Sequence, residues 1–424
     1  MIAAVSSTWA LLLGMALLMI GNGLQGTLLG VRASLEGFAT TITGMLMSGY
    51  YIGFLAGSTL APRLVGRVGH VRVFGALASL ASVAILLHAL FVEPATWMAM
   101  RLISGFCYAG LYVVAESWLN EEATNATRGR LLSVYMVVSL SGVALGQALL
   151  NLADPRGAEL FIMVSVLVSL GLIPMLLSAS PTPAFETPSP VGLRELYRTS
   201  PTAVVGMFAT MMAQGAFFGM GPVYGNEVGL SVREISLFMG LALIGGVCLQ
   251  WPIGRLSDAF DRRQVIIAAS LLAGLLALAA GLLVDASRAA LFGLVALFGG
   301  VMLPMYSLCI AYTNDYLRPE QMVNASGTRV LVGGLGACFG PVTAGLAMSL
   351  LDPSAFFWWL GAVHVAIAAF ALYRTTRRAT PPLDEQGACV AMPRTTQLAV
   401  AMGAEVAGEQ GGDGTSPAAR EQAG

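Results

Sequence analysis

The sequence predicts an all-α membrane protein with twelve transmembrane helices in two pseudo-symmetric six-helix bundles. Three observations favour this fold class: the scarcity of charge, twelve long apolar runs, and a repeat that relates the two halves. Of the 424 residues, 56% are hydrophobic and 11% are charged, whereas soluble domains carry roughly 25% charged residues. So few charged side chains could not cover a surface that faces water.

Each apolar run is roughly 20 residues long and is bounded by charged residues or by Pro and Asn clusters, as membrane spans are. The runs must form helices, because lipid offers no partner for unpaired backbone groups. The first run is too long for a signal-peptide core and lacks a basic start, so we expect a membrane helix there as well. The runs lie near residues 8–31, 41–62, 73–92, 96–119, 131–152, 159–178, 201–225, 234–253, 265–284, 288–312, 323–350 and 355–373.

Arginine supplies all 22 basic residues, and its distribution predicts the orientation of the chain. With the N-terminus inside, fourteen arginines fall in inner segments and four in outer loops. The positive-inside rule therefore places both termini in the cytoplasm, and we expect the bacterial inner membrane. A Pro-, Ser- and Thr-rich stretch separates the halves. The predicted domains are an N-terminal bundle at 1–180, a cytoplasmic linker at 181–200, a C-terminal bundle at 201–374 and a largely disordered cytoplasmic tail at 375–424.

The internal repeat relates positions in the first half to like residues 192 positions later, and 194 positions later beyond the loop between helices three and four. One offset with a single slip of two residues indicates a duplicated six-helix unit. The matching pairs include Met15 and Met207, Asn22 and Gln214, Gly23 and Gly215, Gly53 and Gly245, Tyr112 and Tyr306, Asn120 and Asn314, and Gly146 and Gly340.

Several functional classes find no support in the residues. The five cysteines are scattered without a CxxC spacing and the three histidines are dispersed, so we expect neither a metal nor another cofactor. No nucleophile lies near a base at a usable spacing, which argues against an enzyme. A net charge of −1 gives no sign of a nucleic-acid partner.

Short motifs resemble those of the major facilitator superfamily of secondary transporters, over residues 1–375. The stretch GRLSDAFDRR at 254–263 resembles the family's loop motif G-x-L-x-D-R-x-G-R-R. It keeps Gly254, Asp258, Arg262 and Arg263, among others. The first-half copy, PRLVGRVGHV, keeps Arg67 and Gly69 but has Gly66 in place of the aspartate. The runs VVAESWLN, RGRLLSVYM and QWPIGRLSD are most similar to the YcaD-type branch of the family.

The resemblance implies that helices one, four, seven and ten line a central cavity. Polar residues on these helices are therefore the candidate substrate contacts, although Asn and Gln also bridge helices structurally. The candidates are Asn22, Gln25, Arg101, Tyr108, Tyr112, Gln214, Tyr306 and Thr313.

Helix four carries charge inside an apolar run. At 3.6 residues per turn, Arg101, Tyr108, Tyr112 and Glu116 share one stripe with Gly105. A charge costs at least about 2.5–3.5 kcal/mol at the bilayer centre, so such a stripe faces the bundle interior or a wet path. Arg101 could instead extend to the interface.

Glu116 is the only carboxylate well inside a span, which makes it the candidate for a proton carrier or a gate residue. It could instead be a packing anchor satisfied by Arg67, Arg128 or Arg130 in the cytoplasmic loops.

The resemblance also implies a gate. Asp258 is expected to contact the start of helix five in the other half, near Arg130 and Ser133, where the helix dipole favours an anion. This expected contact is called the latch. The stretch GACFGP, with Gly336, Gly340 and Pro341, resembles the family's hinge and would allow a bend.

Taken together, the sequence predicts a secondary active transporter that moves a small neutral or amphiphilic solute by alternating access. Proton coupling is an expectation from the resemblance, and the expected partners are a small-molecule substrate, the bilayer and protons, with the chain a monomer. Uptake or export of an anionic metabolite or sugar is the alternative that Arg101 favours. A non-transporting sensor or scaffold with the same fold is a second alternative.

Overall fold

The apolar runs form long helices in the computed structural model, which describes residues 2–177, 192–283, 287–377, 382, 386–387, 389–390, 400–403 and 405–406. Side chains are described for these residues except 2–7, 125–126 and 319–320. The first bundle consists of α1 (Ile2–Leu35), α2 (Thr40–Val68), α3 (His70–Leu90), α4 (Pro94–Glu122), α5 (Asn125–Leu149), the short 3₁₀ helix η1 (Leu150–Leu152) and α6 (Glu159–Leu177).

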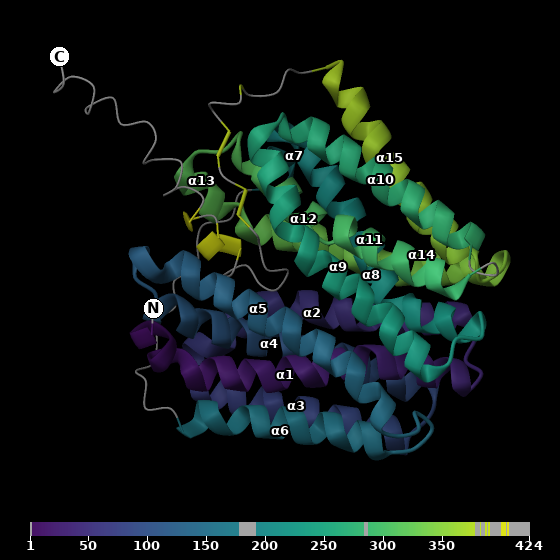
Figure 1. Cartoon of the computed structure of the whole chain (residues 1–424). Helices are drawn as coiled ribbons and strands as arrows, with labels where there is room; N and C mark the ends of the chain where they lie inside the picture. The colour runs from purple at the N-terminus through teal and green to yellow at the C-terminus, as the bar shows by residue number, and fades with distance from the viewer. Residues whose placement is uncertain are drawn as a thin grey trace, which may run out of the picture.

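The second bundle repeats this arrangement after the short helix α7 (Leu193–Thr199), which falls in the predicted linker. Residues 181–191 of that linker lie outside the described residues. It consists of α8 (Pro201–Glu227), α9 (Val232–Ala259), α10 (Arg262–Leu283), α11 (Arg288–Met302), α12 (Met305–Asn314), α13 (Pro319–Asn324), α14 (Ser326–Leu350) and α15 (Ala355–Thr375). Figure 1 shows the two bundles side by side.

Eleven helical segments of the described chain are long and apolar enough to cross a membrane. The twelfth predicted span, α2, has 29 residues but carries more polar side chains. It lies at the seam between the bundles, packed on α4 and on α14. Its polar side therefore faces protein and cavity, which a membrane span tolerates. The prediction of twelve transmembrane helices in two six-helix bundles is confirmed.

The tenth predicted span, 288–312, is not one continuous helix. The helix stops after Met302 and restarts at Met305, with Leu303 and Pro304 between. Proline has no backbone N–H and its ring clashes with the preceding turn, which breaks a helix ladder. Gln214 of α8 donates from Nε2 to the Met302 carbonyl at 3.0 Å, so a side chain satisfies a backbone group at the break.

The repeat holds at the level of individual contacts. Gly53 of α2 lies so close to the Leu102 carbonyl of α4 that an added Cβ would collide with it. Gly245 of α9 lies against the Ala296 carbonyl of α11 in the same way, at offsets of 192 and 194 residues. Small residues allow such close helix packing in membranes. Two more pairs of close approaches correspond in the same way. Gly23 lies against the Val143 backbone as Gly215 lies against that of Ala337, and Gly105 lies against the Tyr50 backbone as Gly299 lies against that of Ala242.

The two bundles meet at one end, which we call the closed end. It carries the last turns of α1 and α8 and the first turns of α2 and α9. Thr40 donates to Glu227 at 2.7 Å, and Asn226 donates to Ser34 at 2.8 Å, so hydrogen bonds cross between the bundles there. At the opposite end, called the open end, the bundles diverge, and the described tail residues lie there (Figure 1).

Two seams run from the closed end and are related by the repeat. In one, Gly44 of α2 lies against the Pro341 carbonyl of α14, 2.5 Å from where a Cβ would stand. In the other, Ser236 of α9 donates to the Gln147 carbonyl of α5 at 2.5 Å. Ser236 follows Gly44 by 192 residues and Pro341 follows Gln147 by 194. The molecule therefore closes at two equivalent places.

Candidate functional site

A cavity of about 300 Å³ lies between the bundles. Its wall comes from α1, α2, α4 and α5 of the first bundle and from α8, α9, α12 and α14 of the second. Cavities of this size hold small organic molecules, and such sites are mainly apolar with a few placed polar groups. The cavity is therefore the candidate substrate site.

Arg101 brings a positive charge to the cavity wall. Its guanidinium carbon stands 4.7 Å from the centre of the Tyr50 ring, a cation–π distance. The residue is 5% exposed, and its Nε has no hydrogen-bond partner. Among the residues that the structure describes, no carboxylate forms an ion pair with it. A buried cation without an anionic partner is costly and is typical of a binding site.

Asn22 and Tyr112 also line the cavity and are joined to the wall by weak hydrogen bonds. Asn22 donates to the Tyr112 hydroxyl at 3.3 Å and accepts from the Tyr50 hydroxyl at 3.4 Å. Tyr112 in turn donates to the sulfur of Met19 at 3.1 Å. The two contacts of the Asn22 amide are long, so a ligand could replace them at little cost.

The wall from the second bundle is neutral. Tyr306 and Ser307 of α12 line it, and Gln250 of α9 donates to the Ser307 hydroxyl at 3.4 Å. Met211 and Phe218 of α8 supply apolar surface, and methionine adapts to irregular ligands. The cavity thus has one cationic wall and one neutral, partly apolar wall.

Four predicted substrate contacts do not line the cavity in this conformation. Gln25 donates to Ser104 at 3.5 Å, and Thr313 donates to the Cys309 carbonyl at 2.8 Å. Tyr108 is buried, and Gln214 binds the helix break as described above. Their role in substrate binding stays a prediction, while Asn22, Arg101, Tyr112 and Tyr306 are brought together around one space.

Glu116 lies one hydrogen bond away from the cavity. Its side chain is fully buried, and its Oε1 accepts from the Tyr135 hydroxyl of α5 at 2.9 Å. Tyr135 lines the cavity. Of the arginines considered as alternative partners, Arg67 and Arg130 are exposed at the open end, and Arg128 forms an ion pair with Glu405.

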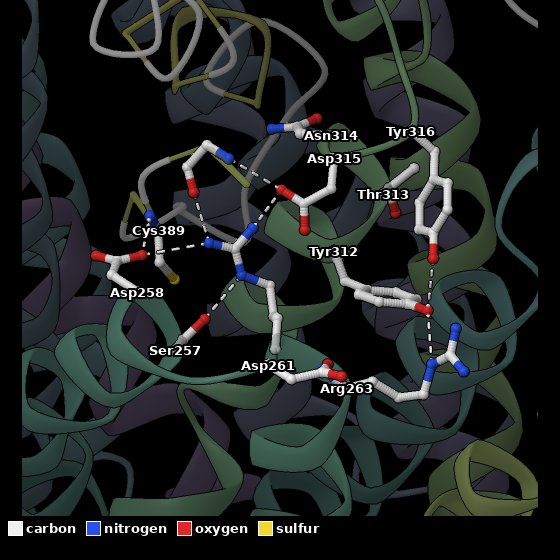
Figure 2. Close-up of polar contacts among 12 residues, drawn as sticks. Ser257, Asp258, Asp261, Arg263, Tyr312, Thr313, Asn314, Asp315, Tyr316 and Cys389 are labelled. Atoms are coloured by element: carbon white, nitrogen blue, oxygen red, sulfur yellow. Dashed lines mark hydrogen bonds and ion pairs between the residues drawn. The ribbon is translucent and has the colours of Figure 1, made fainter. Parts of the chain in front are cut away.

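The second-half motif forms a charged cluster at the open end, shown in Figure 2. Arg262 is almost fully buried and pairs with Asp315 at 2.5 Å and with Asp258 at 3.2 Å. Its Nε donates to Ser257 at 2.8 Å. We call Ser257, Asp258, Arg262 and Asp315 the latch network. Burial raises the pKa of the Asp315 carboxyl to about 6, although the Arg262 guanidinium opposes the shift.

The expected latch partner of Asp258 is absent in this conformation. Asp258 makes no hydrogen bond or ion pair with the described part of α5, and its Oδ1 accepts from the Cys389 backbone N–H at 2.7 Å instead. The reason is geometric, because the bundles are apart at the open end (Figure 1).

The other motif residues occupy structural positions. Arg263 donates to the Tyr312 hydroxyl at 2.9 Å, and Gly69 caps α2 with φ at +88°, where an L side chain would be strained. Gly254 has open space beside it. Gly336 and Gly340 lie against carbonyls of α8 within the second bundle, and α14 continues through Pro341; their hinge role stays a prediction.

The sequence reasoning missed cavity residues on helices outside the set that the resemblance implies. Tyr50, Tyr51 and Phe54 of α2, with Gln147 of α5 and Gln250 of α9, line the cavity. The usable signal was the polar glutamine inside each apolar run and the aromatic cluster on α2. In this conformation the seams between bundles contribute as much wall as the helices that were expected to form it.

Comparisons with known proteins agree with this geometry. A family model described as Major Facilitator Superfamily matches residues 11–246 and again 203–402. The "Uncharacterized MFS-type transporter YcaD" of Escherichia fergusonii is 27% identical over 376 residues, which cover 88% of this chain and 97% of the relative.

Two solved structures share the fold at low sequence identity. The nucleoside transporter NupG aligns with a TM-score of 0.75 at 12% identity, over 88% of this chain and 100% of that chain. A bacterial homologue of the human lysosomal transporter Spinster, solved in an inward-facing and unoccupied conformation, aligns with a TM-score of 0.64 at 13% identity, over 98% of this chain and 99% of that chain.

Proposed function

The chain belongs to the Major Facilitator Superfamily, and from that premise we propose a secondary active transporter that works by alternating access. Support comes from one central cavity with hydrogen bonds and close packing between bundles at one end and divergence at the other. A membrane transporter of this kind needs a second state in which the ends exchange roles. The arginine distribution supports an extracellular closed end, and in the proposed orientation this conformation faces the cytoplasm.

The substrate we propose is an amphiphilic solute that carries one negative charge. Composition favoured a neutral or amphiphilic solute, with an anion as the alternative. The observation that supports the anion is Arg101, a buried cation on the cavity wall with no carboxylate partner among the described residues. A single carboxylate or sulfonate would compensate this charge, and the aromatic and methionine surfaces would hold an apolar body.

Coupling to protons is proposed through Glu116. Its carboxylate is shielded from solvent and reaches the cavity through the Tyr135 hydroxyl at 2.9 Å. A carboxylate inside a span exchanges its proton only through such a contact, because charged groups are costly in lipid. Protonation would then follow the state of the cavity. Glu116 and Arg101 serve separate tasks in this scheme, one carrying the proton and one the substrate charge.

Paired ligands test the substrate class. The purified protein is titrated with apolar monocarboxylic acids and with their methyl esters, and ligand affinity is measured by thermal shift and calorimetry. A charge pair at about 4 Å in a partly polar environment contributes roughly 2–4 kcal/mol. We therefore expect Arg101→Gln to weaken acid binding by about 30- to 900-fold and to leave ester binding nearly unchanged.

The control for this titration is Arg255→Gln. Arg255 is also a cation–π arginine, 4.1 Å from the Trp251 ring, but it is exposed and does not line the cavity. We expect it to bind acids as the unmodified protein does. Equal affinity of the unmodified protein for acids and esters, or an unchanged preference in Arg101→Gln, would contradict the anionic substrate. Uptake of a bound acid into proteoliposomes then tests transport itself.

A further inference from the structure

The C-terminal tail returns to the latch network at the open end. The Cys389 N–H donates to Asp258 at 2.7 Å, and the Gly387 carbonyl accepts from Arg262 at 2.6 Å. The Gly387 N–H also donates to Asp315 at 3.2 Å. Figure 2 shows Cys389 of the tail beside Asp258, with Asp315 nearby. The tail therefore occupies the carboxylate that the latch requires.

A second part of the tail is buried in the apolar clusters of the protein. Val400 is fully buried, and it belongs to the same apolar cluster as Tyr306 and Val330. Both of those residues also line the cavity. Met402, 1% exposed, joins the main apolar core. Burial this complete at a chain end indicates a packed contact, since exposed termini leave such side chains in solvent.

The same part of the tail also contacts the first bundle. Glu405 forms an ion pair with Arg128 at 3.0 Å, in the first turn of α5. Val406 packs on Gly129, where an added Cβ would lie 3.3 Å from the valine Cγ1. The tail thus bonds to the second bundle at the latch network and to the first bundle at the start of α5.

We propose that the described tail residues 386–387, 389–390, 400–403 and 405–406 form a brace that holds the open end apart. The inference rests on the proposed function, because a brace matters only if the bundles move. The latch that the resemblance implies would bring the start of α5 to Asp258, and the tail residues Glu405 and Cys389 are bonded to these two sides, at Arg128 and at Asp258. The brace and the latch therefore exclude each other, and release of the tail is a required step of the cycle.

The tail segment that binds the latch network and the start of α5 is chemically complementary to them. Apolar Val400 and Met402 meet apolar side chains, Glu405 meets an arginine, and backbone N–H groups meet the two acidic residues of the latch network. A tethered segment also docks at a high effective concentration, so few contacts suffice. Single substitutions in the tail should therefore release the brace without unfolding the bundles.

Cys389 reports on docking without any substrate. Burial raises the pKa of its thiol to about 11, and only the thiolate is alkylated. The accessible cysteines Cys248 and Cys338 are replaced by Ser, and maleimide labelling of Cys389 is followed at pH 7.5 in the full chain. We expect labelling to be at least 10-fold faster in Val400→Asp and in Glu405→Arg than in the parent.

Two variants control this measurement. Arg128→Glu combined with Glu405→Arg swaps the charges of the ion pair and should restore slow labelling. Glu121→Arg reverses an exposed charge at the end of α4, outside the brace, and should leave labelling slow. Equal labelling rates in the parent and in Val400→Asp would overturn the docked tail.

Distances across the open end test whether the docked tail acts as a brace. Spin labels at Val68 and Phe260, exposed positions at the ends of α2 and α9, report the separation of the bundles. The labels are introduced with the native cysteines replaced. We expect Glu405→Arg to add a population of shorter distances that the parent lacks. An unchanged distribution would overturn the brace.

Failure of the proposed brace can be distinguished from failure of the proposed transport. A chain whose open-end distances respond to Glu405→Arg, but which transports no tested solute, keeps the brace and contradicts the proposed transport. A chain that transports acids with unchanged distances in Glu405→Arg contradicts the brace alone.

Discussion

Gly44 offers a direct test of what holds the closed end together. An alanine there would place its Cβ 2.5 Å from the Pro341 oxygen and 3.2 Å from the Pro341 carbonyl carbon. Real Cβ atoms do not approach a carbonyl so closely, and backbone atoms cannot turn aside as a flexible side chain can. We therefore expect Gly44→Ala to force α2 and α14 apart, which separates the bundles at the closed end.

The expected shift in the equilibrium between shut and separated closed ends can be calculated, because the clash occurs only in the shut state. Alanine stabilises a helix interior by about 0.5–1 kcal/mol relative to glycine, but this gain is shared by every state that keeps α2 helical. The overpacking cost, about 1–3 kcal/mol, falls only on the state in which the seam is shut. The ratio of shut to separated closed ends should fall by roughly 5- to 150-fold.

Pulsed electron resonance distances would measure this ratio. Labels at Leu90 and Leu282 sit on exposed positions at the closed ends of α3 and α10, and the repeat relates the two residues. We expect a longer distance population in Gly44→Ala. Gly75→Ala is the matched control, because nothing lies within 4 Å of its added Cβ. Identical distributions for the two variants would refute the claim that the seam is held by close backbone packing.

Two further predictions concern buried polar groups. Glu116→Gln should abolish uptake driven by a pH gradient, while solute exchange without a gradient persists. Tyr135→Phe should slow the uptake and weaken its pH response, because the hydrogen bond from Tyr135 to Glu116 is lost. Gradient-driven uptake at the full rate in Glu116→Gln would exclude Glu116 as the proton carrier. Gln214→Leu should destabilise the protein by about 1–3 kcal/mol, because the Met302 carbonyl loses its donor at a helix break; an unchanged melting temperature would contradict this.

The fold could be predicted from the sequence because two strong signals agree. Lipid forces apolar runs into helices, and the duplicated glycines fix how those helices approach one another. Gly53 and Gly245 matched in the sequence, and in the structure they make equivalent contacts. The break after Met302 escaped notice because apolar character continues through Pro304, so the run alone gave no reason to divide it.

The cavity was predicted only in part. Arg101 and Tyr112 stood out because charge and aromatic residues share one stripe of a helix. Tyr50 was missed because the resemblance directed attention to helices one, four, seven and ten. Gln214 could not be distinguished from a substrate contact, since an amide in a span satisfies a helix break or a ligand equally well in sequence terms. Which end is closed depends on small differences between two packed states, and no local pattern encodes them.

The duplication also explains why a tail brace would be effective in this molecule. The closed end has two seams related by the repeat, so its closure does not depend on a single contact. At the open end only one of the two equivalent latch positions carries an acid: Asp258 in the second half, and Gly66, 192 residues earlier, in the first. Nothing lies within 4 Å of a Cβ built on Gly66. An acid at position 66 would provide a second latch position outside the contacts that the described tail residues make. Because that acid is missing, Asp258 is the one acid at the two equivalent latch positions, and in the proposed cycle the tail docked on it keeps the latch from forming.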